Sequence, residues 1–316
     1  MNTIVSHLDT LSNFFNKEDR FMFSKNNEKY HVDLVKMKES NIKIAVFAIF
    51  VEPDYKPTRA LHRTLEIIDK FYSLIANCDE LEIIKSYQDI ELVMNSEKIG
   101  ILLSIEGADG IPDLSVLRIL YRLGVRMISL TWNQRNHLAD GVGDRETNGG
   151  LSLIGKKMIA EMEDLGIVVD VSHISEAGFW DIMKYTHKPV IASHSNAMSI
   201  CQHVRNLTDE QIVALDKRKG VIGINFAPFF VSRKKKVDIN DVIKHINYIK
   251  DLVGIESIIL GTDYDGIQHT PEGLEDISCL KNLELKLYEK GYSKEEVEKI
   301  FYKNALNFFK NFWIKI

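Results

Sequence analysis

The sequence predicts an α/β protein with a (β/α)8 barrel of the TIM type, and three observations favour this fold class. Eight apolar runs rich in Val, Ile and Leu recur along the chain, and most are continuous, as expected for parallel strands buried on both faces. Helical patterns lie between the runs. Several runs end in a side chain that can bind a metal, where a barrel strand would reach its C-terminal mouth.

The strands are expected where aliphatic and β-branched residues, which fit a pleated buried surface, are concentrated. In chain order they are Thr3–Ser6, Ile42–Phe50, Gly100–Ile105, Met127–Thr131, Ile167–Val171, Val190–Ser193, Val221–Phe226 and Ser257–Thr262.

Helices are expected between these strands, where apolar residues recur at helical spacing. They are Arg59–Ala76, Pro112–Leu123, Ser152–Leu165, Glu176–Lys184, Thr208–Asp216, Ile239–Leu252 and Leu280–Tyr288. Several begin at residues that cap helices well, for instance Thr208 with Gln211 three positions later. The alternation of strand and helix favours a closed barrel over an open doubly wound sheet.

Two segments fall outside this alternation. Residues 293–316 predict a capped helix followed by the aromatic-rich stretch FYKNALNFFKNFW, which we expect to pack against the barrel. Residues 9–30 form a long excursion after the first strand, and it could be a lid or an oligomer contact, so a homodimer is possible. Internal repeats and low-complexity linkers are absent from the sequence, so we expect one catalytic barrel domain over residues 1–316 with a C-terminal helical tail.

Composition narrows the class of protein. The chain has 316 residues, of which 45% are hydrophobic and 27% charged, enough for a large core. A net charge of −5 argues against a nucleic-acid partner. The cysteines, Cys78, Cys201 and Cys279, are odd in number and far apart, which suits a reducing compartment. With no signal peptide or membrane-spanning run in the sequence, we expect a cytoplasmic protein with no membrane partner.

Two strand ends carry candidate metal ligands in the first half of the chain. His7 and Asp9 close the first strand in IVSHLDT, and their i, i+2 spacing aims both side chains at one point. Glu106 follows the apolar run ILLSI, where a carboxylate must be paired or must coordinate a cation. An ordinary salt bridge is the alternative, but beside the other donors Glu106 is better interpreted as a bridge between two cations.

The second half contributes two histidines at matching positions. His173 ends VVDVSH and His194 ends VIASH, so on neighbouring strands they would lie close enough to share an ion. The whole donor set has nitrogen and oxygen atoms and no thiolate, which suits Zn²⁺, with Mn²⁺, Co²⁺ or Fe²⁺ possible. Two metals could share a hydroxide nucleophile at neutral pH, which is typical of a metal-dependent hydrolase.

Further candidates are a proton carrier and a substrate clamp. Asp263 ends the last strand in GTDYDG and could act as general base and then general acid. Asp265 is the alternative, although a residue at this place is expected to cap the turn at Gly266. Arg205 precedes the helix capped at Thr208 and could hold a substrate carboxylate in a bidentate fork, the alternative being a surface arginine.

At this point the motifs match a known family. They are S-H-L-D near the start, S-I-E-G-A-D at 104–109, D-V-S-H at 170–173, A-S-H-S-N at 192–196, R-N-L-T-D at 205–209, and G-T-D-Y-D-G followed by P-E-G-L-E-D-I-S at 271–278. With these motifs in order, the chain resembles the membrane dipeptidase (renal dipeptidase) family of zinc peptidases, in its soluble bacterial branch.

The resemblance implies a dipeptidase with two zinc ions that cleaves dipeptides and often tolerates a D-residue at their C-terminal position. It implies that His7 and Asp9 hold one zinc, that His173 and His194 hold the other, and that Glu106 bridges them. It further implies that Arg205 takes the C-terminal carboxylate of the substrate and that Asp263 transfers the proton.

One segment departs from the family pattern. Vertebrate members carry Leu-Thr-His after the fourth strand, with a histidine that polarises the scissile carbonyl, whereas this chain has Trp132 at that place. Asn133, Asn136 or His137 could replace that contact, and Asn133 is our candidate substrate-binding residue. Two other functions remain open: a related barrel amidohydrolase acting on N-acyl amino acids, lactams or lactones, and a catalytically silent barrel that only binds or scaffolds.

Overall fold

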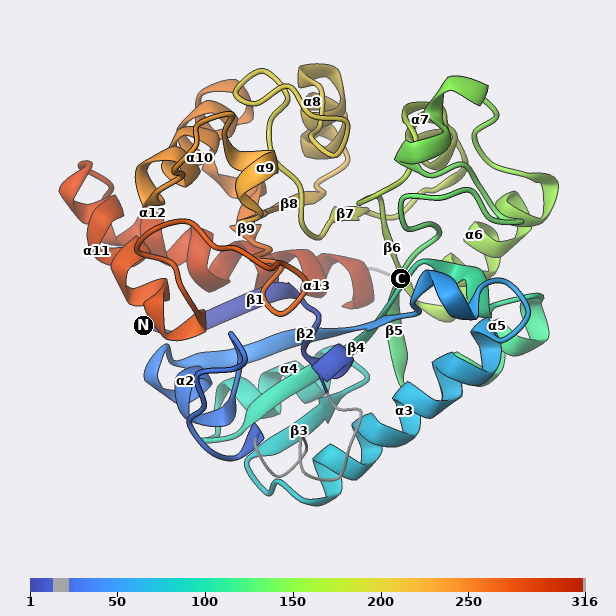
Figure 1. Cartoon of the computed structure of the whole chain (residues 1–316), viewed down its shortest axis with the longest axis horizontal. Coiled ribbons are helices and arrows are strands. Elements are labelled where there is room, and N and C mark those ends of the chain that lie inside the picture. Colours follow the sequence, from blue (N-terminus) through green and yellow to red (C-terminus); the bar gives the residue numbers. More distant parts are fainter. Residues whose placement is uncertain (14–22, 315–316) are drawn as a thin grey trace.

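A closed barrel of eight parallel strands forms the centre of the molecule, which confirms the predicted fold class (Figure 1). The structure, a computed structural model, describes residues 1–13 and 23–314. The barrel strands are β1 (Thr3–Leu8), β2 (Ile42–Phe50), β4 (Ile99–Glu106), β5 (Val125–Ser129), β6 (Val168–Asp170), β7 (Ile191–Ala192), β8 (Val221–Ile224) and β9 (Ile258–Leu260). They pair in this order, and β9 pairs with β1 to close the ring.

Each of the eight expected strands corresponds to one barrel strand. The later ones are shorter than the apolar runs that predicted them, as with Ile191–Ala192 within the predicted 190–193. The reason is that their last residues leave the regular ladder to place side chains at the mouth. The longest pairing joins β2 and β4, from Ile44 opposite Gly100 to Phe50 opposite Glu106.

The connection between β2 and β4 contains elements that the sequence pattern did not predict. A ninth strand, β3 (Leu81–Ile84), pairs with the first half of β4, and the helix α4 (Tyr87–Met94) follows it. Two other short helices, α2 (Leu34–Glu39) and α9 (Pro228–Val231), were also missed. All are shorter than the window of about 11–18 residues over which helical spacing of apolar residues is recognised.

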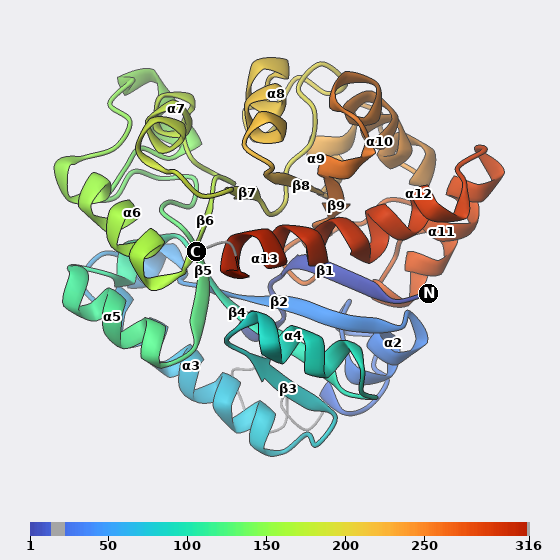
Figure 2. The ribbon, with the colours of Figure 1, turned by 180° about the vertical axis from the view of Figure 1, so that it is seen from behind.

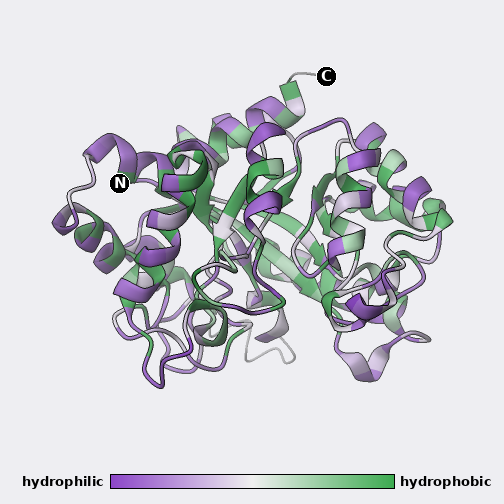
Figure 3. Ribbon diagram, turned by 90° about the horizontal axis from the view of Figure 1, so that it is seen from above, coloured by the Kyte–Doolittle hydropathy of each residue, from purple (hydrophilic) through white to green (hydrophobic). Residues whose placement is uncertain are grey.

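The predicted helices surround the barrel. They are α3 (Ala60–Ala76), α5 (Leu114–Arg122), α6 (Leu153–Leu165), α7 (Glu176–Tyr185), α8 (Asp209–Lys217), α10 (Ile239–Val253) and α11 (Leu280–Glu289). Hydrophobic residues concentrate on the central strands and hydrophilic residues lie mainly outside (Figure 3). Helix α8 begins with the expected capping box between Thr208 and Gln211. This ring of helices buries the outer face of the barrel.

The C-terminal segment closes the N-terminal end of the barrel. After α12 (Lys294–Glu298), the helix α13 (Asn304–Ile314) lies across the barrel when it is seen from behind (Figure 2). Its aromatic side chains share one buried cluster with residues from the beginnings of the strands; this cluster includes Phe308, Phe309, Phe312, Ile4, Ile44, Met127, Val168, Val221 and Ile259. The barrel is therefore an apolar core at this end, and chemistry is confined to the other.

Two expectations concern the excursion after the first strand and the absence of a membrane-spanning segment. The excursion predicted at residues 9–30 includes residues 14–22, which lie outside the described part of the chain, so its lid and oligomer-contact interpretations stay predictions. Among residues 1–13 and 23–314, no helix combines the length and the apolar composition that crossing a membrane requires.

Truncating the aromatic plug should destabilise the fold. We expect Phe308→Ala to lower the free energy of unfolding by about 3–5 kcal/mol, because a fully buried aromatic side chain leaves a cavity against the strand ends. Denaturant titration of metal-free protein measures this. Lys310→Ala, at an exposed position of the same helix, is the control and should change stability by less than about 0.5 kcal/mol. Equal stability of the two variants would contradict a structural role for α13.

Candidate metal centre and active site

The five predicted metal ligands converge at the C-terminal mouth of the barrel. His7 lies in β1 and Asp9 directly follows it, Glu106 is the last residue of β4, and His173 and His194 follow β6 and β7. All five are buried. This convergence follows from the fold, since the carboxyl ends of parallel barrel strands meet at one mouth.

Glu106 stands between two groups of donors. Its Oε1 lies 2.8 Å from His173 Nε2 and 3.4 Å from His194 Nε2. On the other side, Oε1 lies 3.9 Å from His7 Nε2, which is 3.4 Å from Asp9 Oδ2. Among the described residues, three sets of three donors are each compact enough to hold one ion; two of them share Glu106, and the third joins Asp170 to His7 and His194.

The donors fit metal ions better than they fit one another. Among the described residues, both ring nitrogens of His7 and Oδ1 of Asp9 are buried with no hydrogen-bond partner, a costly arrangement in a folded protein. The Nε2 atoms of His173 and His194 lie only 2.8 Å apart. A cation would satisfy these atoms together, and the nitrogen and oxygen donors match borderline divalent ions.

The charge balance of the site points the same way. Burial opposes protonation of His7, but the carboxylates of Asp9, Glu106 and Asp263 outweigh it and raise the pKa of His7 to about 10. Burial, with the nearby carboxylates of Asp9 and Glu106, raises the pKa of Asp263 to about 7. The site therefore lacks positive charge, which a bound cation would supply.

Asp263 follows β9 with its backbone in the left-handed region, at φ 66°. Its Oδ2 accepts a hydrogen bond from Asn225 Nδ2 at 2.9 Å, and its Oδ1 lies 4.0 Å from His7 Nε2. Gly266 packs over this corner: a Cβ there would lie 2.1 Å from Asp9 Oδ2 and 2.8 Å from Asp263 Oδ1. Sequence reasoning missed Asn225, because an asparagine after an apolar strand has no distinctive spacing.

Asp265 has a different place from the one that we predicted. Its Oδ2 accepts a hydrogen bond from Thr10 Oγ1 at 2.9 Å, and its Oδ1 accepts one from the His31 backbone at 2.8 Å. It therefore ties down the segment after β1, and the expectation that its side chain caps the turn at Gly266 was wrong. Burial raises the pKa of Asp265 to about 6.

Arg205 is a buried arginine, which excludes the surface alternative. Its side chain is 4% exposed; Nη2 donates to the His194 carbonyl at 3.2 Å, and Nε has no partner among the described residues. Burial lowers the pKa of Arg205, although Asp263 and Glu106 oppose this. A buried guanidinium with an unused N–H can bind an anionic group.

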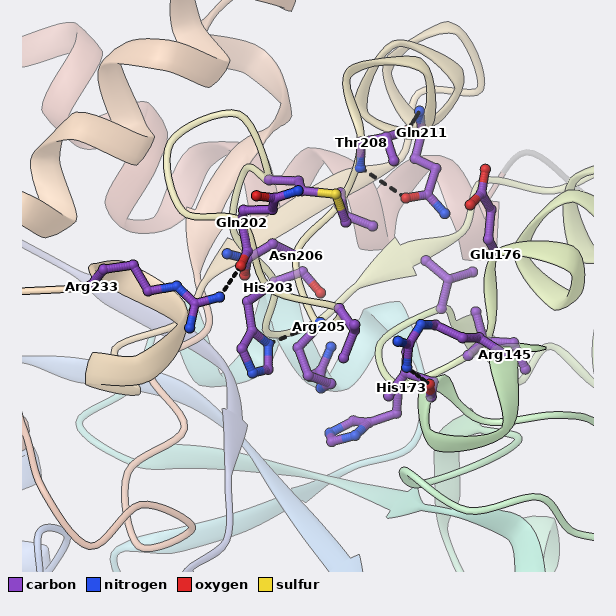
Figure 4. A pocket seen from close by; sticks show the side chains of 17 residues that line it. Arg145, His173, Glu176, Gln202, His203, Arg205, Asn206, Thr208, Gln211 and Arg233 are labelled. Atoms are coloured by element: carbon purple, nitrogen blue, oxygen red, sulfur yellow. Dashed lines mark hydrogen bonds between the residues drawn. The ribbon is translucent and has the colours of Figure 1, made fainter.

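Two cavities meet at His173, which lines both. The first holds about 350 Å³, and Arg205 stands in it between two exposed arginines, Arg145 and Arg233 (Figure 4). The second holds about 540 Å³ and is lined by donors and aromatic side chains, among them Asp9, Glu106, Asp263, Phe50, Trp132 and Phe229. A small molecule can therefore lie across the donors with an anionic group toward Arg205.

The structure distinguishes the three candidates for the missing histidine. Asn136 donates to the Leu130 carbonyl, and His137 Nε2 contacts the Ile111 carbonyl at 3.0 Å; neither lines the two cavities. Asn133 lines the larger cavity, and its Oδ1 lies 2.8 Å from His173 Nδ1. The side chain of Asn133 thus contacts His173, and the contact of Asn133 with substrate stays a prediction.

Comparison with known proteins identifies the family. The chain matches the profile of the membrane dipeptidase family, peptidase family M19, over residues 1–312. The chain belongs to this family. It is therefore an M19 metallopeptidase, a metal-dependent hydrolase, which agrees with the donor clusters at its barrel mouth.

Relatives of this M19 peptidase cover most of its length. An uncharacterised dipeptidase of Schizosaccharomyces pombe is 35% identical over 302 residues, 89% of this chain and 72% of that protein. Dipeptidase tcpJ of Claviceps purpurea is 30% identical over 309 residues, 92% of this chain and 71% of that protein.

Solved structures show the same fold. A family M19 metallopeptidase described as dipeptidase AC superposes with a TM-score of 0.93 at 25% identity, covering 99% of both chains. A metallopeptidase from Rhodobacter sphaeroides, solved with a phosphinate mimic of the dipeptide L-Ala-D-Ala, gives 0.94 at 23% identity, again over 99% of both chains.

A buried histidine that hydrogen-bonds the backbone after β7 should make the stability of this M19 peptidase sensitive to acid. His245 of α10 is buried; its Nδ1 accepts from the Ala197 backbone at 3.2 Å and its Nε2 donates to the Val231 carbonyl at 2.8 Å. Burial lowers its pKa to about 4. Between pH 6.5 and 4 the unfolded chain binds a proton that the folded chain refuses, so stability falls as pH falls, by roughly 3 kcal/mol from this residue.

We expect His245→Gln to lose less stability than the wild type between pH 7 and pH 4. Denaturant titrations of the metal-free proteins at both pH values measure the difference. His62→Gln, at a histidine whose side chain is 75% exposed, is the control and should follow the wild type. If His245→Gln also follows the wild type, this histidine does not titrate in the way that its burial implies.

Proposed function

We propose that this chain is a dipeptidase that hydrolyses dipeptides, including those with a C-terminal D-residue, at a centre of two zinc ions. The observation that carries the proposal is the buried Arg205, placed in a cavity that meets the donor cluster at His173. The names of the fungal relatives and the L-Ala-D-Ala mimic bound to the Rhodobacter sphaeroides structure support this substrate class.

The five donors divide between the two ions. His7 and Asp9 would hold one, His173 and His194 the other, and Glu106 both, since its Oε1 faces the two pairs. Zn²⁺ suits this set of nitrogen and oxygen donors, with Mn²⁺, Co²⁺ or Fe²⁺ as alternatives. When bound, the ions supply water activation at neutral pH and polarisation of the scissile carbonyl.

The remaining residues bind the peptide and move the proton. The Arg205 guanidinium holds the C-terminal carboxylate, and this charged pair fixes the peptide bond across the donors. Asp263 takes a proton from the attacking water and gives it to the leaving amine, with Asn225 holding its second oxygen in place. Asn133 lines the larger cavity, where it can also contact the peptide.

Metal content tests the centre itself. Reconstituted wild-type protein should contain two divalent ions per chain by elemental analysis. Glu106→Gln should weaken both ions, because its carboxylate is shared, whereas His7→Ala should mainly empty one site. His62→Ala, far more exposed, is the control and should retain both ions. A wild-type content of one ion or fewer after reconstitution would rule out the dinuclear centre.

Substrate preference tests the role of Arg205. Free dipeptides, L,L and L,D, should be cleaved faster than the same peptides with an amidated C-terminus, N-acyl amino acids or lactones. Arg205→Lys should lower kcat/KM on free dipeptides by an amount that corresponds to about 2–4 kcal/mol of transition-state binding. The reason is that lysine cannot form the bidentate pair with the carboxylate.

The exposed Arg233 of the same cavity provides the matched control. Arg233→Lys should remain close to wild type on neutral dipeptides. Equal cleavage of amidated and free dipeptides by the wild type would show that no carboxylate clamp operates, and preference for lactones or N-acyl amino acids would favour the amidohydrolase alternative.

Asp263 can be separated from the metal ligands. Asp263→Asn keeps the shape of the side chain and removes its basicity, so kcat should fall by about 10²–10⁴-fold while both ions stay bound. Asp265→Asn is the matched comparison and should affect rate less, since Asp265 holds Thr10 and His31. Greater loss of turnover in Asp265→Asn than in Asp263→Asn would overturn this assignment.

A further inference from the structure

A buried hydrogen-bond chain runs behind His194 into the barrel interior. The Ser193 Oγ lies 2.8 Å from His194 Nδ1 and 2.5 Å from Asp170 Oδ2. All three residues are almost fully buried, at 3% exposure or less. The side chain of Asp170, at the end of β6, therefore reaches the ligand on the neighbouring strand end through one hydroxyl group.

The direction of this chain follows from its donors and acceptors. Asp170 Oδ1 accepts from the backbone N–H groups of Ser172 at 2.9 Å and of Ser193 at 3.0 Å, so its carboxylate acts as an acceptor. A serine hydroxyl has a single hydrogen, which goes to Asp170 Oδ2. Ser193 Oγ is then left to accept the Nδ1–H of His194, and Nε2 keeps its lone pair.

We propose that Asp170 and Ser193 are positioning residues that hold His194 in the Nδ1–H tautomer and aim its Nε2 at the metal centre. Nε2 faces the other donors, 3.4 Å from Glu106 Oε1. Hydrogen bonds of this kind orient metal-binding histidines and raise their basicity. The inference rests on the metal centre of the proposed function.

The two histidines are held differently. His173 Nδ1 faces the amide oxygen of Asn133, which lines the cavity, whereas the support of His194 ends in the buried carboxyl group of Asp170. Asp170 also binds the backbone just before each histidine, through Ser172 and Ser193. Its backbone role and its role toward the His194 tautomer must therefore be separated by experiment.

Asp170→Asn makes this separation because it reverses the chain. The amide oxygen can still accept from both backbone N–H groups, but the amide NH₂ donates to Ser193 Oγ. The hydroxyl then donates to His194 Nδ1, which at 2.8 Å is nearer than Ser172 Oγ at 3.4 Å, and this places the ring proton on Nε2 and blocks the metal. We expect Zn²⁺ affinity at one of the two sites to fall by about 10–100-fold, measured by competition with a chelator.

Ser193→Ala removes the hydroxyl and leaves the tautomer unconstrained, so its loss of affinity should be smaller than that of Asp170→Asn. The double variant should bind Zn²⁺ more tightly than Asp170→Asn alone, because the wrongly directed donor is gone. A purely structural role for Asp170 predicts the opposite, since both losses would add. Ser104→Ala, at a buried serine of β4 that bonds the Phe47 carbonyl, is the control and should keep wild-type affinity.

Visible spectra of the Co²⁺-substituted proteins provide a second readout, because a displaced imidazole changes the ligand field of one ion only. Recovery in the double variant, with one ion affected, supports the proposal. Wild-type Zn²⁺ affinity in Asp170→Asn, or a double variant weaker than both single variants, overturns it. The wild-type stoichiometry from the same titration reports separately on the dinuclear centre.

Discussion

The placement of Glu106 is the constraint on which the rest of the site depends. Its strand pairs on both sides up to this residue, with Phe50 of β2 opposite it on one side and Ser129 of β5 on the other. The carboxylate is therefore held at a position where β4 is paired with a strand on each side. A buried carboxylate is tolerated only where opposite charge faces it, and the two donor groups on either side of Glu106 define where that charge must be.

The barrel interior changes character along its axis. At the N-terminal end, aromatic side chains of α13 pack against the first residues of the strands. Higher up the interior becomes polar: Ser6 Oγ lies 2.7 Å from the Ser193 carbonyl oxygen and 2.9 Å from the Leu260 carbonyl oxygen, and Asp170 reaches Ser193. The ligands occupy the mouth above this layer. Stability and chemistry are thus assigned to opposite ends of one barrel, which is the division that parallel barrels generally show.

Much of this arrangement could be predicted from the sequence, because buried parallel strands appear as apolar runs and their C-terminal ends are marked by polar residues. The eight barrel strands and the convergence of His7, Glu106 and His194 follow from that rule alone. Short elements such as β3 escaped prediction, since four residues are too few for a distinctive pattern. Contacts between strands escaped too: the pairing of Asp170 with Ser193 spans 23 positions, and no local spacing encodes it.

The backbone at the site is strained, and this strain lowers the stability of the fold. His173 and Asp263 both lie in the left-handed region, at φ 68° and 66°, where side chains with a Cβ are disfavoured by about 1 kcal/mol or more each. Both residues turn the chain sharply as it leaves a strand, which is how their side chains reach the mouth. Glycine would adopt these angles without strain. The fold therefore accepts backbone strain at the two positions that place these side chains at the mouth. Selection for stability alone would favour glycine at both positions and would remove the side chains that the activity needs.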